Sequence, residues 1–132
     1  MKNKNKFYIN IAKEISTASY CLKLKVGAII VKNNNIISFG YNGTPYGFNN
    51  LCEINNITLP EVIHAEINAI IKCAKIGIST EKSEMYITHS PCLNCAKLII
   101  QAGINKVYYN IFHKKDGIEI LEKANIAVKQ IT

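Results

Sequence analysis

Apolar residues recur at steps of three and four in two long segments of the chain, a period that is typical of amphipathic helices. The first segment is residues 7–21. Its apolar positions are Phe7, Ile11, Ile15 and Ala18, and Leu22 directly after it continues the period. In the second, residues 63–76, they are Ile63, Ile67, Ile70, Ile71 and Ala74. Gly77 then ends the run as a helix breaker. We expect both segments to form helices, and the first to pack its apolar face on a sheet.

Shorter apolar and β-branched runs predict the strands. The first two runs, residues 26–32 and 36–41, are separated by three asparagines, which tolerate the left-handed backbone of a tight turn. We therefore expect an antiparallel hairpin. Later strands are predicted at residues 85–88, 106–110 and 126–130, with helices between them at residues 92–102 and 117–124. This alternation indicates an α/β fold with a mixed sheet and helices on both faces.

The length of 132 residues suits a single domain, residues 1–132, with one core. Residues 42–60 are rich in Gly, Asn and Pro and keep no sustained period. Because long loops in compact domains usually carry function, we assign this segment to a site or an interface.

The formal net charge is +7, which could indicate a nucleic-acid partner. All 16 basic residues are Lys, however, and a lysine meets a phosphate as a point charge without the planar two-pronged contact of an arginine. We therefore interpret the charge as general surface charge and do not expect nucleic acid to bind. The polar start at residues 1–6 and the lack of a long apolar run predict neither a signal peptide nor a membrane span.

The chain has five cysteines, at positions 21, 52, 73, 92 and 95. An odd number without an export signal favours thiols or metal ligands over disulfides, and a reducing cytoplasm as the location. Cys21 and Cys52 alone cannot complete a four-ligand structural metal site, so a second metal site is not expected. Cys73, among apolar helix positions, is most simply a core residue.

His64 and Glu66, two residues apart at a helix start, are followed by Cys92 and Cys95, three residues apart at another helix start. Either pair alone is weak evidence. Together, one imidazole and two thiolates make three zinc ligands with a fourth position left open, which is the pattern of a catalytic zinc site. The partial positive charge of a helix start favours the thiolate that binds the metal.

Glu66 points about 200° around a regular helix from His64, so we expect it to face a zinc-bound water and not the metal. Zinc lowers the pKa of that water to about 7 and makes a hydroxide nucleophile. A carboxylate beside this water can take its proton, pass it to a ring nitrogen of the substrate, and later protonate the leaving ammonia. The residues alone therefore predict a zinc-dependent hydrolase.

These motifs resemble the His-x-Glu and Pro-Cys-x-x-Cys signature of the cytidine deaminase superfamily. The nearer resemblance is to the deoxycytidylate (dCMP) deaminases, because three further segments match. They are the loop from Gly40 to Gly47, HAEINAI from His64, and THSPCLNC from Thr88 with the helix that follows it. The resemblance implies a three-layer α/β/α fold with a five-stranded mixed sheet. It implies hydrolysis of dCMP to dUMP and ammonia by a zinc-bound hydroxide, with Glu66 as the proton shuttle.

The resemblance also implies roles for single residues. Zinc ligation falls on His64, Cys92 and Cys95. Substrate contacts fall on the backbone of Ala65 and Ser90, on Asn42 and Thr44 in the matched loop, and on Lys23, which stands where many relatives have Arg. Lys25 and Lys97 are further candidates for the 5′-phosphate. Relatives imply a homo-oligomer and a nucleoside triphosphate effector at the segment of Gly43, Pro45 and Gly47.

For His89 and His113 we expect surface or packing roles, because neither falls on a ligand position of the signature. Two rival hypotheses stay open. One is a polynucleotide deaminase acting on tRNA adenosine or single-stranded DNA, which the basic charge favours. The other is a zinc-containing nucleotide-binding module without catalysis, which an intact Glu66 argues against.

Overall fold

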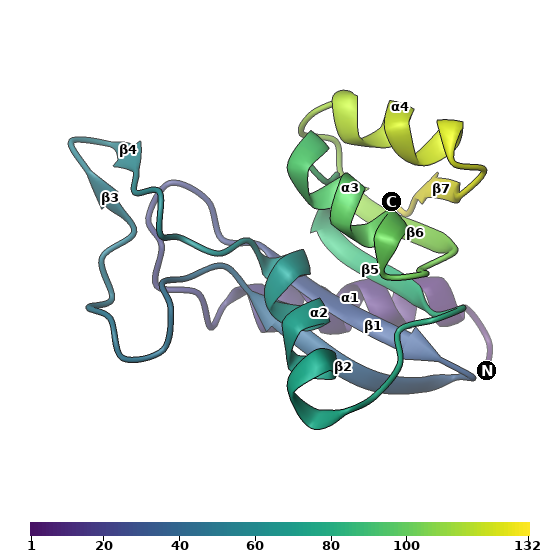
Figure 1. Cartoon of the computed structure of the whole chain (residues 1–132). Helices are drawn as coiled ribbons and strands as arrows, with labels where there is room; N and C mark the ends of the chain where they lie inside the picture. The colour runs from purple at the N-terminus through teal and green to yellow at the C-terminus, as the bar shows by residue number, and fades with distance from the viewer.

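A central sheet of five strands organises the computed structural model, which describes all residues from 1 to 132. The strand order is β2-β1-β5-β6-β7 (Figure 1). The strands are β1 (Gly27–Lys32), β2 (Asn35–Tyr41), β5 (Glu84–His89), β6 (Lys106–Ile111) and β7 (Ala127–Gln130). β1 runs antiparallel to β2 and β5, whereas β5, β6 and β7 are parallel to one another. The mixed sheet and its first antiparallel pair are confirmed.

The hairpin between β1 and β2 turns at Asn33 and Asn34, whose φ angles are 50° and 62°. Two successive positive φ angles are what a type I′ turn requires, and asparagine adopts them at low cost. Along β1, Ile29 and Ile30 are both fully buried but belong to different cores, because successive side chains of a strand point to opposite faces. β1 is therefore covered on both sides.

Four helices form the two outer layers of the fold. α1 (Lys4–Ser16) packs on one face, over β1 and β5. α2 (Ala65–Ile76), α3 (Leu93–Gln101) and α4 (Asp116–Lys123) share the core on the other face. Figure 1 shows α1 behind the sheet and the other three helices in front of it. The three-layer α/β/α arrangement is confirmed, and none of these helices has the length and apolar character to cross a membrane.

Two glycines let helices approach the sheet closely. A Cβ atom on Gly27 would collide with the α1 backbone at Ala12, and one on Gly40 would collide with the α2 backbone at Ala65 and Ala69. Only glycine has no side-chain atom at these contacts. The contact at Gly40 therefore places the start of α2 directly against β2. This start carries two residues of the predicted site, Ala65 and Glu66.

The first helix begins and ends earlier than residues 7–21. It spans Lys4–Ser16, and after it the hydroxyls of Ser16 and Thr17 donate to carbonyls three residues earlier at 2.6 Å each, which competes with further helix growth. Leu22 lies in the following loop and is 85% exposed. The buried residues of the helix are Tyr8, Ile9 and Ala12, one position away from the predicted face.

The second helix spans Ala65–Ile76, and its N-cap is His64, which has an extended backbone. The predicted isoleucine face is correct only in part, because Ile70 packs against the core whereas Ile71 is 56% exposed. At Gly40 the helix backbone at Ala65 and Ala69 comes close to β2, and the buried residues of the helix are Ala65, Glu66, Ala69 and Cys73.

We call residues 42–63 the arm, because this segment projects away from the sheet (Figure 1). The predicted loop at residues 42–60 contains a short hairpin of β3 (Glu53–Ile54) and β4 (Ile57–Thr58), which turns at Asn55 and Asn56 with positive φ. A β-bridge between Gly43 and Ile63 joins the two ends of the arm.

A disulfide joins Cys21, in the loop after α1, to Cys52, in the arm. The preference for thiols or metal ligands over disulfides is therefore wrong for this pair, whereas Cys73, Cys92 and Cys95 are free. The two positions are 31 residues apart in sequence and meet only because the arm folds back beside the loop. A count of cysteines does not reveal such a meeting.

Candidate active site

The three predicted metal ligands converge where two helices begin. His64 is the N-cap of α2, Cys92 is the N-cap of α3, and Cys95 lies in the first turn of α3. His64 Nδ1 is 3.1 Å from Cys95 Sγ and 3.6 Å from Cys92 Sγ. The three potential ligand atoms all lie within 4.8 Å of one another. The structure thus brings together three residues that the sequence motifs singled out.

The two thiols of this cluster differ in their affinity for a proton. The pKa of Cys92 falls to about 3, chiefly because its sulfur accepts a hydrogen bond from the Cys95 thiol and also bonds to His64. The same hydrogen bond, together with burial, raises the pKa of Cys95. The bond to Cys92 raises the pKa of His64, whereas the nearby charge of Lys114 lowers it. The cluster therefore holds a thiolate, which is the form that binds metal.

Glu66 lies in the first turn of α2 and is only 4% exposed. Burial is the main cause that raises the pKa of its carboxyl above the usual value. It contacts Cys95, so the carboxyl lies beside the ligand cluster. A carboxyl with a raised pKa holds a proton more readily than an ordinary carboxylate, which suits a general acid and base.

A pocket with a volume of about 460 Å³ opens beside the cluster. Pockets for small ligands typically have volumes of about 300–1,000 Å³. Of the predicted site residues, the pocket is lined by Lys23, Asn42, His64, Ala65, Glu66, Ser90 and Cys92. Cys95 is buried behind this surface and Thr44 lies outside it.

Two residues of the matched loop are held by hydrogen bonds within the chain. The Asn42 side chain accepts a hydrogen bond from the Val26 N–H at 2.9 Å and donates one to the Leu24 carbonyl at 2.8 Å. It therefore fastens the segment before β1 to the start of the arm. The Thr44 hydroxyl donates to the Asn49 carbonyl at 2.9 Å, and the Thr44 N–H donates to the Tyr20 hydroxyl at 2.8 Å, so Thr44 joins the arm to the loop after α1.

The three lysines considered for a phosphate lie in different surroundings. Lys23 lines the pocket. The ammonium of Lys25 donates to the carbonyls of Ser19 at 2.6 Å and Cys21 at 2.8 Å. Lys97 is exposed on α3 and does not line the pocket. Of these three lysines, only Lys23 is placed to contact a ligand in the pocket.

Glu53 of the arm also lines the pocket, although no sequence motif singles it out. Its carboxylate accepts hydrogen bonds from the N–H groups of Leu22 at 3.2 Å and Lys23 at 3.1 Å. With the disulfide at the neighbouring Cys52, this contact holds the Lys23 loop against the arm.

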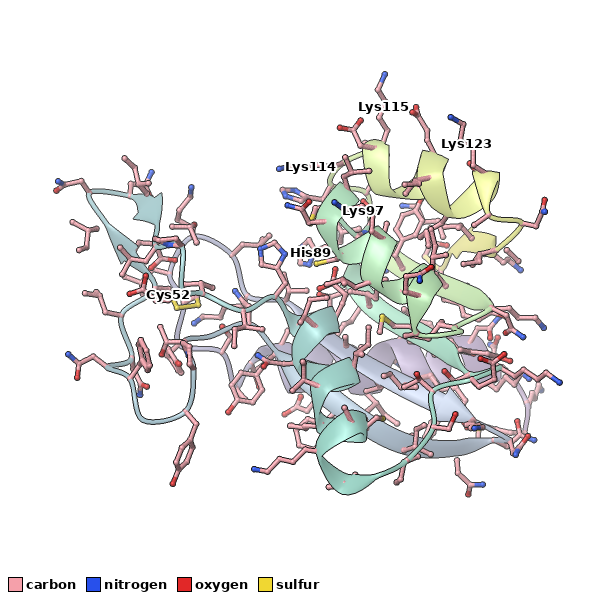
Figure 2. The ribbon with its side chains drawn as sticks, viewed as in Figure 1. Cys52, His89, Lys97, Lys114, Lys115 and Lys123 are labelled. Carbon is pink, nitrogen blue, oxygen red and sulfur yellow. A yellow bond between two sulfur atoms is a disulfide. The ribbon has the colours of Figure 1, made fainter.

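Other residues of the pocket wall that were not predicted for the site include His89, His113 and Lys114. Figure 2 shows His89 and Lys114 on the side of α3 and α4, and Cys52 across from them toward the arm. The His89 and His113 rings meet edge to face, with their centroids 6.3 Å apart. Burial, followed by the charge of His113, lowers the pKa of His89, so this ring is neutral at neutral pH. The sequence signal that could have identified His89 is its position in the THSPC motif, three residues before Cys92.

The chain is similar to curated proteins and to solved structures. It is 37% identical to the ComE operon protein 2 of Bacillus subtilis, a match that covers 96% of this chain and 70% of that protein. It is 35% identical to the deoxycytidylate deaminase of Enterobacteria phage T4, over 91% of this chain and 86% of that one. A crystal structure of the dCMP deaminase from cyanophage S-TIM5 in complex with dCMP and dUMP matches with a TM-score of 0.95 at 44% identity, over 99% of both chains.

The fold and the His-Cys-Cys cluster beside a buried carboxyl define a protein of the zinc deaminase class. The sequence profile of the cytidine and deoxycytidylate deaminase zinc-binding region matches residues 1–111. This chain belongs to that family, and the resemblance found in its motifs is confirmed.

Proposed function

We propose that this protein is a zinc-dependent hydrolase that converts dCMP to dUMP and ammonia. The observation that carries the proposal is the buried Glu66 carboxyl beside the cluster of His64, Cys92 and Cys95, at a pocket of small-ligand size. The choice of dCMP is supported by the phage T4 deoxycytidylate deaminase and by the cyanophage dCMP deaminase in complex with dCMP and dUMP. All of residues 1–132 would act as one deaminase domain.

The donor set fits zinc, which would be held by His64, Cys92 and Cys95. With Zn–N distances of about 2.0–2.1 Å, Zn–S distances of about 2.3 Å and tetrahedral angles, a nitrogen and a sulfur ligand lie about 3.6 Å apart. The corresponding distances here are 3.1 and 3.6 Å. Bound zinc supplies Lewis acidity that makes water a nucleophile at neutral pH.

Glu66 is the proposed proton carrier. Hydrolysis forms a C4–O bond, breaks the C4–N bond to the amino group, and moves two protons from water, one to the ring nitrogen N3 and one to the departing amino group. A buried carboxyl with a raised pKa suits both transfers. Glu66 lies beside the ligand cluster, where the cytosine ring would also lie, so this one carboxyl would serve both proton transfers.

Backbone and side-chain groups of the pocket would orient the nucleotide. We assign the Ala65 N–H and the Ser90 carbonyl to the edge of the base, with the carbonyl near the departing amino group. Asn42 and Lys23 would meet the sugar and the phosphate, since both line the pocket. Thr44 lies outside the pocket, so its role is confined to holding the loop around Asn42.

A homo-oligomer is the proposed assembly. The arm exposes five large hydrophobic residues, and such a group commonly marks an interface; they are Tyr46, Phe48, Leu51, Ile54 and Ile57. A nucleoside triphosphate effector would bind at residues 43–47, and a change in KM with added dCTP would report it. The cytoplasm is the proposed location, because nucleotide substrates occur there.

The test compares zinc-loaded wild-type protein with Glu66→Gln and with the matched control Glu61→Gln, an exposed arm residue. Loss of cytosine absorbance measures turnover of dCMP. Glu66→Gln is expected to keep its zinc and to lose turnover by at least about 100-fold, whereas Glu61→Gln keeps both.

An active Glu66→Gln would refute the proton-carrier role. A fully zinc-loaded wild type that is inert on dCMP would refute the substrate assignment. Release of ammonia from single-stranded DNA or tRNA, and not from dCMP, would support the polynucleotide alternative instead.

A further inference from the structure

The pocket wall holds a second lysine that no motif assigns. Of the sixteen lysines, only Lys23 and Lys114 line the pocket. They come from different parts of the fold, because Lys23 precedes β1 and Lys114 lies in the loop between β6 and α4. Any anion in the pocket therefore meets one positive charge from the arm side and another from the side of α4.

The loop that carries Lys114 is exposed, yet it is fastened to the loop of the metal ligands. The Ser90 hydroxyl, buried two residues before Cys92, accepts hydrogen bonds from the N–H groups of His113 at 2.8 Å and Lys114 at 3.1 Å. The Ser90 N–H in turn donates to the Ile111 carbonyl at 2.9 Å. These bonds fix the Lys114 backbone relative to the cluster.

Gly117 adds a steric contact at the same place. A Cβ atom on Gly117 would collide with the carbonyl of Pro91, so the start of α4 lies directly against the residue before Cys92. The segment from His113 to Gly117 is thus held at both ends against residues 90–92, while the Lys114 side chain keeps the reach and the rotational freedom of a four-carbon stem.

The charge of Lys114 is available to a ligand. Its ammonium donates no hydrogen bond to the chain, in contrast to Lys25, whose ammonium is bound to two carbonyls. The Glu53 carboxylate, which lines the pocket near Lys23, already accepts hydrogen bonds from two backbone N–H groups. A doubly charged phosphate monoester matches two lysines that approach from opposite walls.

We propose that Lys114, held in place by the Ser90 hydroxyl, is a phosphate-binding residue that acts with Lys23 and selects the nucleoside monophosphate over the nucleoside. This inference rests on the proposed function and deepens it. Lys114 binds the substrate directly, and the Ser90 hydroxyl is a positioning group that acts through Lys114.

The first test compares dCMP with deoxycytidine in zinc-loaded wild type, Lys114→Ala, Lys114→Arg and Lys115→Ala. Lys115 is the adjacent control, because it is exposed and does not line the pocket. Lys114→Ala is expected to lower the ratio of kcat/KM for dCMP over deoxycytidine by about 10- to 100-fold, mainly through KM for dCMP. Lys114→Arg keeps most of the ratio, and Lys115→Ala changes it less than about twofold.

The positioning role of Ser90 is tested by a double-mutant cycle. Ser90→Ala is expected to raise KM for dCMP more than KM for deoxycytidine. In a Lys114→Ala background, the same change is expected to leave that difference between substrates unaltered, because the group that Ser90 positions is gone. An equal effect in both backgrounds would contradict the positioning role.

Calorimetric titration with dUMP and deoxyuridine separates the two claims. If wild type turns over dCMP but Lys114→Ala keeps the wild-type ratio of affinities for dUMP over deoxyuridine, the inference is overturned and the proposed function stands. If wild type is inert on dCMP, the proposed function fails. The dUMP titration of Lys114→Ala still decides whether Lys114 binds a phosphate.

Discussion

The two ends of the pocket are built differently. At the metal end, His64 and Cys92 cap helices that pack on the sheet, and Gly40 lets α2 approach β2 without a gap. At the mouth, Lys23 and Lys114 lie in exposed loops. Each loop is held by the hydrogen bonds of one side chain, Glu53 or Ser90, and the Lys23 loop is also held by a disulfide. Regular elements hold the groups proposed to react, whereas loops carry the lysines proposed to recognise substrate.

This difference has a physical basis. Metal ligation and proton transfer need atoms placed within a fraction of an ångström, which packed helix termini provide. A flexible lysine tolerates small movements when it meets a phosphate. Changes at the metal end should therefore abolish turnover, whereas changes at the mouth should alter KM.

The largest effect is expected at the metal end from Cys95→Ala. Loss of one of three ligands is expected to release zinc and to reduce turnover of dCMP to background. Cys73→Ala is the matched control, because Cys73 is also a buried free thiol but belongs to the core. It is expected to keep zinc and turnover and to lose about 1 kcal/mol of stability. Metal analysis and activity distinguish the two variants, and an active zinc-loaded Cys95→Ala would remove Cys95 from the ligand set.

A smaller effect is expected from Gly40→Ala, which leaves every site residue unchanged. The new Cβ must push α2 away from β2 and shift His64 and Glu66 with it. We expect a loss of about 1–3 kcal/mol in the free energy of unfolding and a fall in kcat.

Gly77→Ala is the control, since Gly77 has a φ of 77° at the C-cap of α2 and no neighbour within 4 Å of an added Cβ. It should lose about 1 kcal/mol of stability while kcat stays constant. Urea unfolding and initial rates measure both quantities, and equal kcat values for the two variants would contradict the account of α2.

At the mouth, Glu53→Ala is expected to raise KM for dCMP several-fold with little change in kcat. The reason is that the Lys23 loop loses the carboxylate that holds its N–H groups. Reduction of the Cys21–Cys52 disulfide with dithiothreitol should act in the same direction and more weakly while Glu53 remains. A fall in kcat without a change in KM would place Glu53 in the chemistry instead.

The smallest effect concerns pH. Burial lowers the pKa of His89 below the ordinary value of 6.5, so the folded protein binds fewer protons at this residue than the unfolded chain does. The free energy of unfolding therefore decreases as the pH falls through 6.5 toward the folded pKa. Zinc-loaded His89→Gln should lose less stability than wild type between about pH 7.5 and about pH 5.5. Parallel urea-unfolding curves for the two proteins would argue against this.

The meeting of His64, Cys92 and Cys95 could be predicted from the sequence because it is encoded by local motifs. Residue type and spacing place His64 at one helix start and Cys92 with Cys95 at another, and the strand pattern predicts the sheet that joins them. The apolar period was less informative. It selected Ile71 and Leu22 for burial, although the close approach at Gly40 and the early end of α1 leave both exposed.

The mouth could not be predicted in the same way, because its residues are assembled by contacts between distant segments. The disulfide, the Glu53 contact with the Lys23 loop, and the Ser90 contact with the Lys114 loop each join positions more than 20 residues apart. No local period or short motif encodes such pairs.

The central claim is hydrolytic conversion of dCMP to dUMP at this site, and isotope labelling tests it most directly. Zinc-loaded protein would be incubated with dCMP in water enriched in heavy oxygen, and the product analysed by mass spectrometry. We expect dUMP that carries one heavy oxygen in its base, formed by wild type and not by Glu66→Gln. Unchanged dCMP, or dUMP without the heavy oxygen, would contradict the account.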